Sequence, residues 1–357
     1  MHPLNTSTPS EPMKKLSFQL QFHTPAFLGD ATQSARWRTP PFKAQLRQWW
    51  RVAYAAQRQL DVDVDVRDMR EMEGQLFGNA WLEDNFCKSL VRIRLDQWTH
   101  GRLNNWVPTQ QVHHPEVGGV GSDLYLGYGP LTLPRGTRQP VLKAGAAIQA
   151  GESAKFSLAY PDTDAHLMES ALTLMQAYGT VGGRSRNGWG SYNMLASMGT
   201  PLAEPSGRTR DWFACLRQDW PHAIGSDDDG ALVWQTKQAF NDWKQLFKVM
   251  AETKIGIRRL FLFPHAQPDG AIHDRHWLSY PITRHDVADW KRKNLRLPNT
   301  LRFKVRPTAD GQLVGVVFHM PHKPPAEFGS TPQTLERIWR QVHSHLDQSP
   351  SLKRIPA

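Results

Sequence analysis

The sequence contains only two cysteines, Cys87 and Cys215, which stand far apart. Two isolated thiols form neither a disulfide framework nor the ligand spacing of a zinc site. The chain also lacks any run approaching the ~18 apolar residues of a membrane span. Its polar, proline-rich N-terminus does not have the pattern of a signal peptide. We therefore expect a cytoplasmic protein with no membrane partner.

Acidic residues are missing where basic residues gather. The 357 residues include 43 Lys and Arg against 33 Asp and Glu, which gives a formal net charge of +10. The segment from Ala31 to Leu60 has no acid, and a second basic group lies between Lys291 and Arg306. An excess of this kind favours a polyanionic partner.

Metal-binding and catalytic patterns are also missing. The 15 histidines include four close pairs, but no pair has Cys or carboxylates at a recognised ligand spacing. No order of Ser, His and acid matches a known catalytic triad. We therefore expect no metal and no cofactor.

The first half of the chain has the element order of a small α+β unit. Apolar residues alternate from Lys14 to Thr24, which predicts a half-buried strand, and Phe42 to Leu60 has the periodicity of a helix. Further elements are expected at Ser89 to Leu95, Lys155 to Tyr160, Asp164 to Tyr178 and Trp189 to Leu195. This order is ferredoxin-like or RRM-like, with long loop insertions from His100 to Gly151.

A linker at Thr200 to Arg210 separates the second half. We divide the chain into a disordered segment (1–13), a ferredoxin-like domain with a glycine-rich loop (14–200), a second α+β domain (201–350) and a disordered tail (351–357). Helices are expected in the second domain at Asp211 to Trp220, Ala231 to Glu252 and Thr331 to Leu346. Strands are expected at Arg258 to Phe263, Asn299 to Val305 and Gly311 to Met320.

The stretch from Ala177 to Tyr192 is rich in glycine around Arg184 and Arg186. Glycines let the backbone approach a partner closely. The preceding helix is expected to stop at Gly179, and because a helix C-terminus repels phosphate, an anion here must be held by the two arginines. The spacing differs from both nucleotide-binding glycine motifs. The alternative is a glycine-rich turn with solvated arginines.

A basic stripe is expected on the first helix. Lys43, Arg47 and Arg51 stand at i, i+4 and i+8, where like charges cost about 0.2 to 0.5 kcal/mol per pair. An anion along the stripe would reverse the sign, and the alternative is a solvated helix face. Candidate stacking platforms for single-stranded RNA stand among the basic residues; they are Trp37, Trp50, Tyr125, Tyr128 and Trp189. Of these, Trp50 is expected in the core rather than as a platform, because helical spacing places it near the apolar face.

Four segments carry a resemblance to a known family. They are TPAFLGD (Thr24 to Asp30), RTPPFKAQLRQWWR (Arg38 to Arg51), EGQLFG (Glu73 to Gly78) and GTVGGRSRNGWG (Gly179 to Gly190). In this order they resemble the RAMP superfamily of CRISPR proteins, nearest to the two-domain first subunit of the Cmr (type III-B) effector complex. The segment from Arg296 to Phe318 is similar to a late part of the same subunit.

The resemblance implies tandem ferredoxin-like (RRM-like) domains and a non-catalytic RNA-binding role. The implied partners are the 3′ part of a guide (CRISPR) RNA, target RNA and other subunits of the complex. Ala44 and Pro41 depart from the usual glycine and serine, which affects how RNA approaches the helix start. Together with the basic and aromatic residues above, the expected RNA-binding residues are Arg36, Arg38, Lys43, Arg47, Arg51, Arg184, Ser185, Arg186 and Trp189.

Two other functions remain open. A CRISPR endoribonuclease that processes repeat RNA without a metal would need a general base, for which His23 at the strand end is the candidate. Asp30, in the same loop, is the alternative catalytic residue, as a ligand of a divalent ion. A structural adaptor would instead present its basic surfaces to acidic protein partners.

Overall fold

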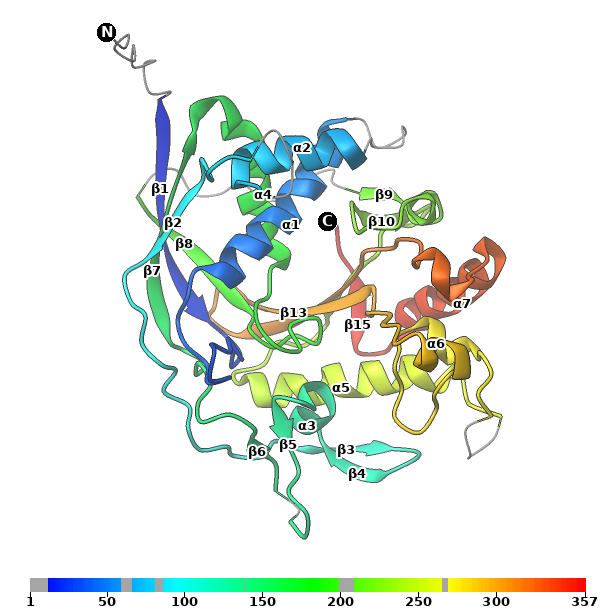
Figure 1. Cartoon of the computed structure of the whole chain (residues 1–357). Coiled ribbons are helices and arrows are strands. Elements are labelled where there is room, and N and C mark those ends of the chain that lie inside the picture. Colours follow the sequence, from blue (N-terminus) through cyan, green and yellow to red (C-terminus); the bar gives the residue numbers. More distant parts are fainter. Residues whose placement is uncertain (1–11, 59–65, 81–85, 138, 199–208, 265–268) are drawn as a thin grey trace, which may run out of the picture.

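The structure is a computed structural model that describes residues 12–58, 66–80, 86–137, 139–198, 209–264 and 269–357. It is a mixed α+β protein with several small antiparallel sheets (Figure 1). Two four-stranded sheets dominate, one built by each half of the chain. Among the described residues no helix is both long and apolar enough to cross a membrane.

The first sheet has the strand order β2-β7-β1-β8. Helices α1 and α4 pack against each other on one face of it (Figure 1). The buried side chains of β1 face these helices, because apolar and polar residues alternate along the strand. The elements of this half are β1 (Met13–Phe22), α1 (Pro40–Gln57), α2 (Val66–Phe77), β2 (Arg92–Leu95), β7 (Ser153–Pro161), α4 (Ala165–Tyr178) and β8 (Tyr192–Met198), with a 3₁₀ turn at Asp162–Asp164.

The second sheet repeats this arrangement. Its order is β13-β14-β12-β15, and the chain passes through these strands and two long helices in the same sequence of strand, helix, two strands, helix, strand. The elements are β12 (Val233–Thr236), α5 (Trp243–Arg259), β13 (Leu301–Pro307), β14 (Leu313–His319), α7 (Pro332–Asp347) and β15 (Leu352–Arg354). Each half therefore has the same topology.

Smaller elements fill the connections. The insertion expected as long loops between His100 and Gly151 contains two hairpins and a short helix, which pack beneath α5 (Figure 1). These are β3 (Gln111–His114), β4 (Gly118–Gly121), α3 (Ser122–Gly127), β5 (Leu131–Thr132) and β6 (Val141–Leu142). The second half adds β9 (Thr209–Asp211), β10 (Ile224–Asp227), β11 (Gly230–Ala231), α6 (Ala288–Arg292) and 3₁₀ turns at Ala214–Arg217, Asp274–Trp277 and Ala326–Phe328.

The two halves share their cores. The buried cluster around the first sheet includes Phe318 of β14, whose ring lies 4.9 Å from that of Tyr178 on α4. The second cluster includes Trp189 from the loop before β8. The boundary expected at residue 200 therefore separates two repeats of topology, but not two independent hydrophobic cores.

Several sequence predictions are confirmed. The strand from Lys14, the helices from Phe42 and Asp164, and the final helix are present as β1, α1, α4 and α7. Thr331 caps α7 by accepting a hydrogen bond from the Thr334 amide. The turn between β13 and β14 has Gly311 at φ 79°, as a tight hairpin requires.

Three predictions in the second half are wrong. The helix expected at Asp211 to Trp220 is only a 3₁₀ turn, because residues 209–211 pair with β10 instead. The helix expected from Ala231 begins at Trp243, since residues 233–236 form the strand β12 between β14 and β15. The strand expected at Arg258 to Phe263 does not form, because Arg258 and Arg259 are the last residues of α5 and residues 260–263 follow it as a turn and irregular chain.

The tail expected to be disordered is also ordered. Residues 352–354 form β15 and pair with β12, and the Ile355 amide donates to the Val233 carbonyl at 3.0 Å. Arg354 forms ion pairs with Asp227 and Asp347. The remaining boundary predictions fall largely outside the described residues, namely the 1–13 segment up to residue 11, Leu60 at the end of the first helix, and residues 200–208 of the linker expected at Thr200 to Arg210. The last two residues of that linker belong to β9.

Candidate nucleic-acid interface

The glycine-rich loop connects α4 to β8 and folds tightly on itself. Gly190 has φ 61°, and a Cβ there would lie 1.9 Å from the Val181 carbonyl oxygen. Gly188, at φ 90°, approaches Met250 of α5 in the other half, whose Cε would lie 2.5 Å from a Cβ. Gly179 follows α4 as expected but is extended, at φ −71°. These glycines therefore serve close approaches within the chain.

Arg184 is the more exposed of the two arginines in this loop. It is held at φ 57°, a left-handed conformation that costs a non-glycine residue roughly 1 kcal/mol or more. Its Nε donates to the Tyr128 carbonyl at 2.6 Å, and the Tyr128 side chain is 60% exposed. The Arg184 guanidinium is therefore anchored to the backbone of a tyrosine whose side chain is exposed.

Cations from α5 lie close to Arg184. Arg258 donates to the Tyr125 hydroxyl at 3.2 Å, and Lys254 donates to the Asn187 side-chain oxygen at 2.6 Å. Burial lowers the pKa of Lys254 well below its ordinary value, and the charges of Arg258 and Arg184 act in the same direction. Lys254 is buried, so the residue of α5 that extends the basic surface of the loop is the partly exposed Arg258.

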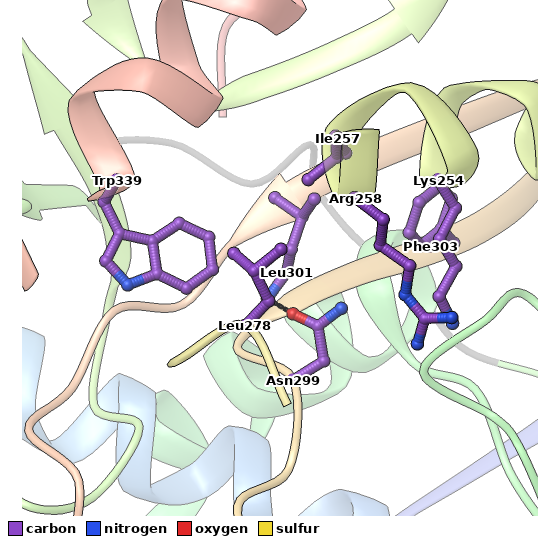
Figure 2. Close-up of a pocket in the computed structure, with 8 residues that line it drawn as sticks. All are labelled: Lys254, Ile257, Arg258, Leu278, Asn299, Leu301, Phe303 and Trp339. Atoms are coloured by element: carbon purple, nitrogen blue, oxygen red, sulfur yellow. Dashed lines mark hydrogen bonds between the residues drawn. The ribbon is translucent and has the colours of Figure 1, made fainter. Parts of the chain in front are cut away.

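Lys254 and Arg258 also line a small pocket (Figure 2). Figure 2 shows their side chains leaving α5 side by side, with Asn299 below them. The rest of the lining is apolar and consists of Ile257, Leu278, Leu301, Phe303 and Trp339. No carboxylate lines this pocket, so its polar side offers cationic and amide donors.

Ser185 and Arg186 continue the loop toward β13. Both are partly exposed, and the Arg186 carbonyl accepts a hydrogen bond from the Phe303 amide at 3.0 Å. Burial lowers the pKa of the Arg186 guanidinium. No hydrogen bond or ion pair joins the Arg186 side chain to the described part of the chain.

The basic stripe on α1 pairs with a buried carboxylate of the same chain. Arg47 Nε and Arg51 Nε both lie 2.9 Å from Oε1 of Glu73 on α2, and Arg51 Nη2 lies 2.8 Å from Oε2. Glu73 is 2% exposed. Lys43 donates to the Phe77 carbonyl at 2.8 Å. The stripe therefore joins α1 to α2, and contact with RNA by these three residues stays a prediction.

Part of the second basic group, which runs from Lys291 to Arg306, makes contacts within the chain. On β13, Lys304 Nζ donates to the carbonyls of Gln176 and Gly179 at 2.7 and 2.8 Å, and Arg306 Nε donates to Ala177 at 2.7 Å. These carbonyls belong to the C-terminal end of α4, which carries the negative end of the helix dipole. Two of the late cations therefore cap a helix of the first half.

Arg36 and Arg38 stabilise the loop that follows β1. Arg36 is exposed and its Nε donates to the Trp98 carbonyl at 2.7 Å, while Arg38 Nη1 donates to the Gly29 carbonyl at 2.8 Å. The Trp98 side chain is 58% exposed. The hydrogen bond from Arg36 to the Trp98 backbone was missed in the sequence, because the two residues lie 62 positions apart.

Three of the expected aromatic platforms are buried. Trp37, Trp50 and Trp189 are 0%, 1% and 0% exposed. The prediction that Trp189 stacks on RNA is wrong for this structure, because its ring is enclosed by the rings of Phe27, Trp106, Trp243 and Phe247. Tyr128 and Trp98 are the exposed rings that accompany basic residues.

The alternative catalytic residues, His23 and Asp30, have different surroundings. His23 is largely buried at the end of β1 and its Nε2 has no hydrogen-bond partner. Burial lowers the pKa of His23 to about 4, and the charge of Lys304 adds to this shift. Asp30 instead accepts hydrogen bonds from the amide and hydroxyl of Thr32. No described group of three or more His, Cys, Asp or Glu could hold a metal ion.

No protein-family model and no curated protein matches the sequence. Among solved structures, the chain is similar to Cmr1 from Pyrococcus furiosus in its apo form, with TM-score 0.43 and 15% identity over 87% of this chain and 90% of that one. It is also similar to a chain of the Type III-B Cmr-beta bound to cognate target RNA, with TM-score 0.46 and 12% identity over 92% and 99%. The chain is thus structurally similar to Cmr1 and to type III-B Cmr subunits.

Proposed function

We propose that this chain is a non-catalytic RNA-binding subunit of a type III-B CRISPR effector complex, built from tandem ferredoxin-like domains. The observation that carries the proposal is the basic surface around Arg184. There Arg184, held at φ 57°, donates to the backbone carbonyl of the exposed Tyr128, and Arg258 of α5 lies close enough to act on it electrostatically. A basic groove with an aromatic platform suits single-stranded RNA.

Two features of the fold support the proposal. The same strand order in both sheets is the order expected of a ferredoxin-like repeat. The four sequence segments that resemble the RAMP superfamily also meet in space, since Gly183 donates to the Phe27 carbonyl, Arg38 to the Gly29 carbonyl and Arg47 to the Glu73 carboxylate. Guide RNA, target RNA and neighbouring subunits of the complex are the proposed partners.

The test is the salt dependence of RNA binding. An unstructured 5′-labelled RNA is titrated with the unmodified chain and with the double variant Arg184→Ala, Arg258→Ala at several salt concentrations. Each lost phosphate contact should reduce the slope of log K against log salt by about 0.7. The matched control is Arg94→Ala, an exposed arginine on β2. Equal slopes for all three proteins would reject this surface as the RNA site.

The same samples address the nuclease alternative. The neutral His23 imidazole, with its free Nε2, is the observation that keeps an endoribonuclease open. Run on denaturing gels with Mg²⁺, the RNA should remain intact. Cleavage that disappears in His23→Ala, with binding retained, would replace the binding-subunit proposal with the nuclease.

A further inference from the structure

Arg302 is a buried cation whose role the fold does not explain. Along β13 the side chains of residues 302, 304 and 306 share one face. Lys304 and Arg306 satisfy carbonyls of α4. Arg302 is only 7% exposed, yet its Nε has no hydrogen-bond partner and no described carboxylate pairs with it.

Arg186 and His322 lie beside Arg302. The backbone bridge between Asn187 and Phe303 brings Arg186 beside it. Burial and the charge of Arg186 lower the pKa of Arg302 to about 9. His322 lies close enough that both arginines contribute to lowering its pKa to about 4, after burial. No carboxylate contributes to any of these shifts.

Two neighbouring arginines, one of them buried, are unfavourable for the fold when no anion is bound between them. Burying an unpaired guanidinium costs free energy, and like charges beside it add to the cost. A bound anion would reverse both effects. An arginine presents a planar fork of donors that matches the oxygens of a phosphate group, and a second arginine allows a second pair of contacts.

We infer that Arg186 and Arg302 form a binding site for one phosphate group at the seam between the two halves of the chain, with His322 at its edge, where the His322 Nδ1 donates to the Met320 carbonyl. Arg186 and His322 are partly exposed and leave the site open to solvent, while Arg302 forms its floor. The phosphate belongs either to an internal diester or to the terminal monoester of an RNA strand. The assignment to RNA rests on the proposed function, whereas the anion site itself does not.

The first experiment uses inorganic phosphate alone. Thermal unfolding of the full chain is measured in phosphate-free buffer and with phosphate, at ionic strength matched with NaCl. For 357 residues, phosphate at one hundred times its Kd should raise Tm by about 3 to 4 °C. Arg302→Met should lose this response and have an equal or higher Tm without phosphate, because it removes an unpaired buried charge. Arg94→Met is the control and should respond like the unmodified chain.

Three results of the thermal unfolding experiment would overturn the proposed phosphate site. An unmodified chain whose Tm does not respond to phosphate has no such site. Arg302→Met that melts well below the unmodified chain in phosphate-free buffer would show that Arg302 stabilises the fold. Arg186→Met, in the partly exposed loop, is the second variant, and a full phosphate response in it would also reject the proposal.

The second experiment identifies the source of the phosphate. Two RNAs of identical sequence are used, one ending in a 3′-hydroxyl and one in a 3′-phosphate. If Arg302→Met weakens binding of both about equally, the site holds an internal diester; if it weakens only the 3′-phosphate RNA, the site holds the terminal monoester. If Arg302→Met binds both RNAs as the unmodified chain does, the assignment of the site to RNA is overturned and the proposed function stands. If the unmodified chain itself binds neither RNA, the proposed function is rejected instead.

Discussion

The carboxylate of Glu73 provides the sharpest test of how α1 and α2 are held together. It is 2% exposed and accepts three hydrogen bonds from Arg47 and Arg51. Glu73→Gln keeps one oxygen but places an amide donor against Arg51 Nη2. Breaking a buried ion pair costs about 3 to 5 kcal/mol. Because both arginine side chains are about one-third exposed, we expect the lower end, about 3 kcal/mol.

Urea unfolding followed by tryptophan fluorescence measures this loss. With an unfolding entropy of about 2.1 cal/mol/K per residue, 3 kcal/mol corresponds to a fall in Tm of about 4 °C. Glu71→Gln on the same helix is the matched control, since Glu71 is 43% exposed and pairs with an 86% exposed arginine. It should change stability by less than about 1 kcal/mol. Equal effects of the two substitutions would refute the buried ion-pair argument.

Glu73→Gln also tests the basic stripe as an RNA site. The substitution leaves the charges of Arg47 and Arg51 without their internal counterion. If the stripe contacts RNA phosphate, the slope of log K against log salt should become steeper by about 0.7 for each added contact. An unchanged slope would assign both arginines to the fold alone.

Three further predictions concern the seam, the buried histidines and the exposed ring. Lys304→Met should cost about 2 to 3 kcal/mol in thermal unfolding, because it leaves carbonyls at the end of α4 unpaired, whereas exposed Lys353→Met should be near neutral. Burial lowers the pKa of His343 to about 3 and of His23 to about 4. Below pH 6.5 these two histidines are therefore protonated in the unfolded chain while they stay neutral in the folded chain. Stability should therefore fall as pH is lowered from 6.5 to 4, and a constant urea midpoint over that range would contradict this reasoning. Tyr128→Ala should weaken RNA binding about tenfold by filter binding, with no change in Tm, since a base stacked on an aromatic ring contributes about 1 to 3 kcal/mol.

Elements with a strong local signal could be predicted from the sequence. The strand β1 alternates because one face packs on helices and the other meets solvent. The helix α7 begins at a threonine cap followed by proline, which are both local features. Where the pattern and the cap lie within one element, the sequence was sufficient.

The strand β12 could not be predicted in this way. It lies between β14 and β15 and is buried on both faces, so it lacks alternation. Its Trp234 donates to Asp347, which is 113 residues away. Because both its pairing partners come much later in the chain, the segment was interpreted as the start of the following helix.

The candidate site shows the same limit. The arginines of the glycine-rich loop were identified from composition, and Arg184 is exposed as an RNA contact requires. Lys254 and Arg258 come from the other half and were missed, whereas Arg302 was noted only as a member of the second basic group. The counterion of the α1 stripe was also missed, because Glu73 lies 26 and 22 residues from Arg47 and Arg51.

The glycine-rich loop covers the free edge of β13, so the second half of the chain would lose this cover if it were produced without the first. In the second sheet β13 is an edge strand, and its outward amides are occupied by the loop, with Phe303 donating to the Arg186 carbonyl and Val305 to Ser191 Oγ. Unpaired strand edges template aggregation. A fragment that begins after the first half would expose this edge together with Arg302 and Lys304, and we expect it to self-associate when produced alone.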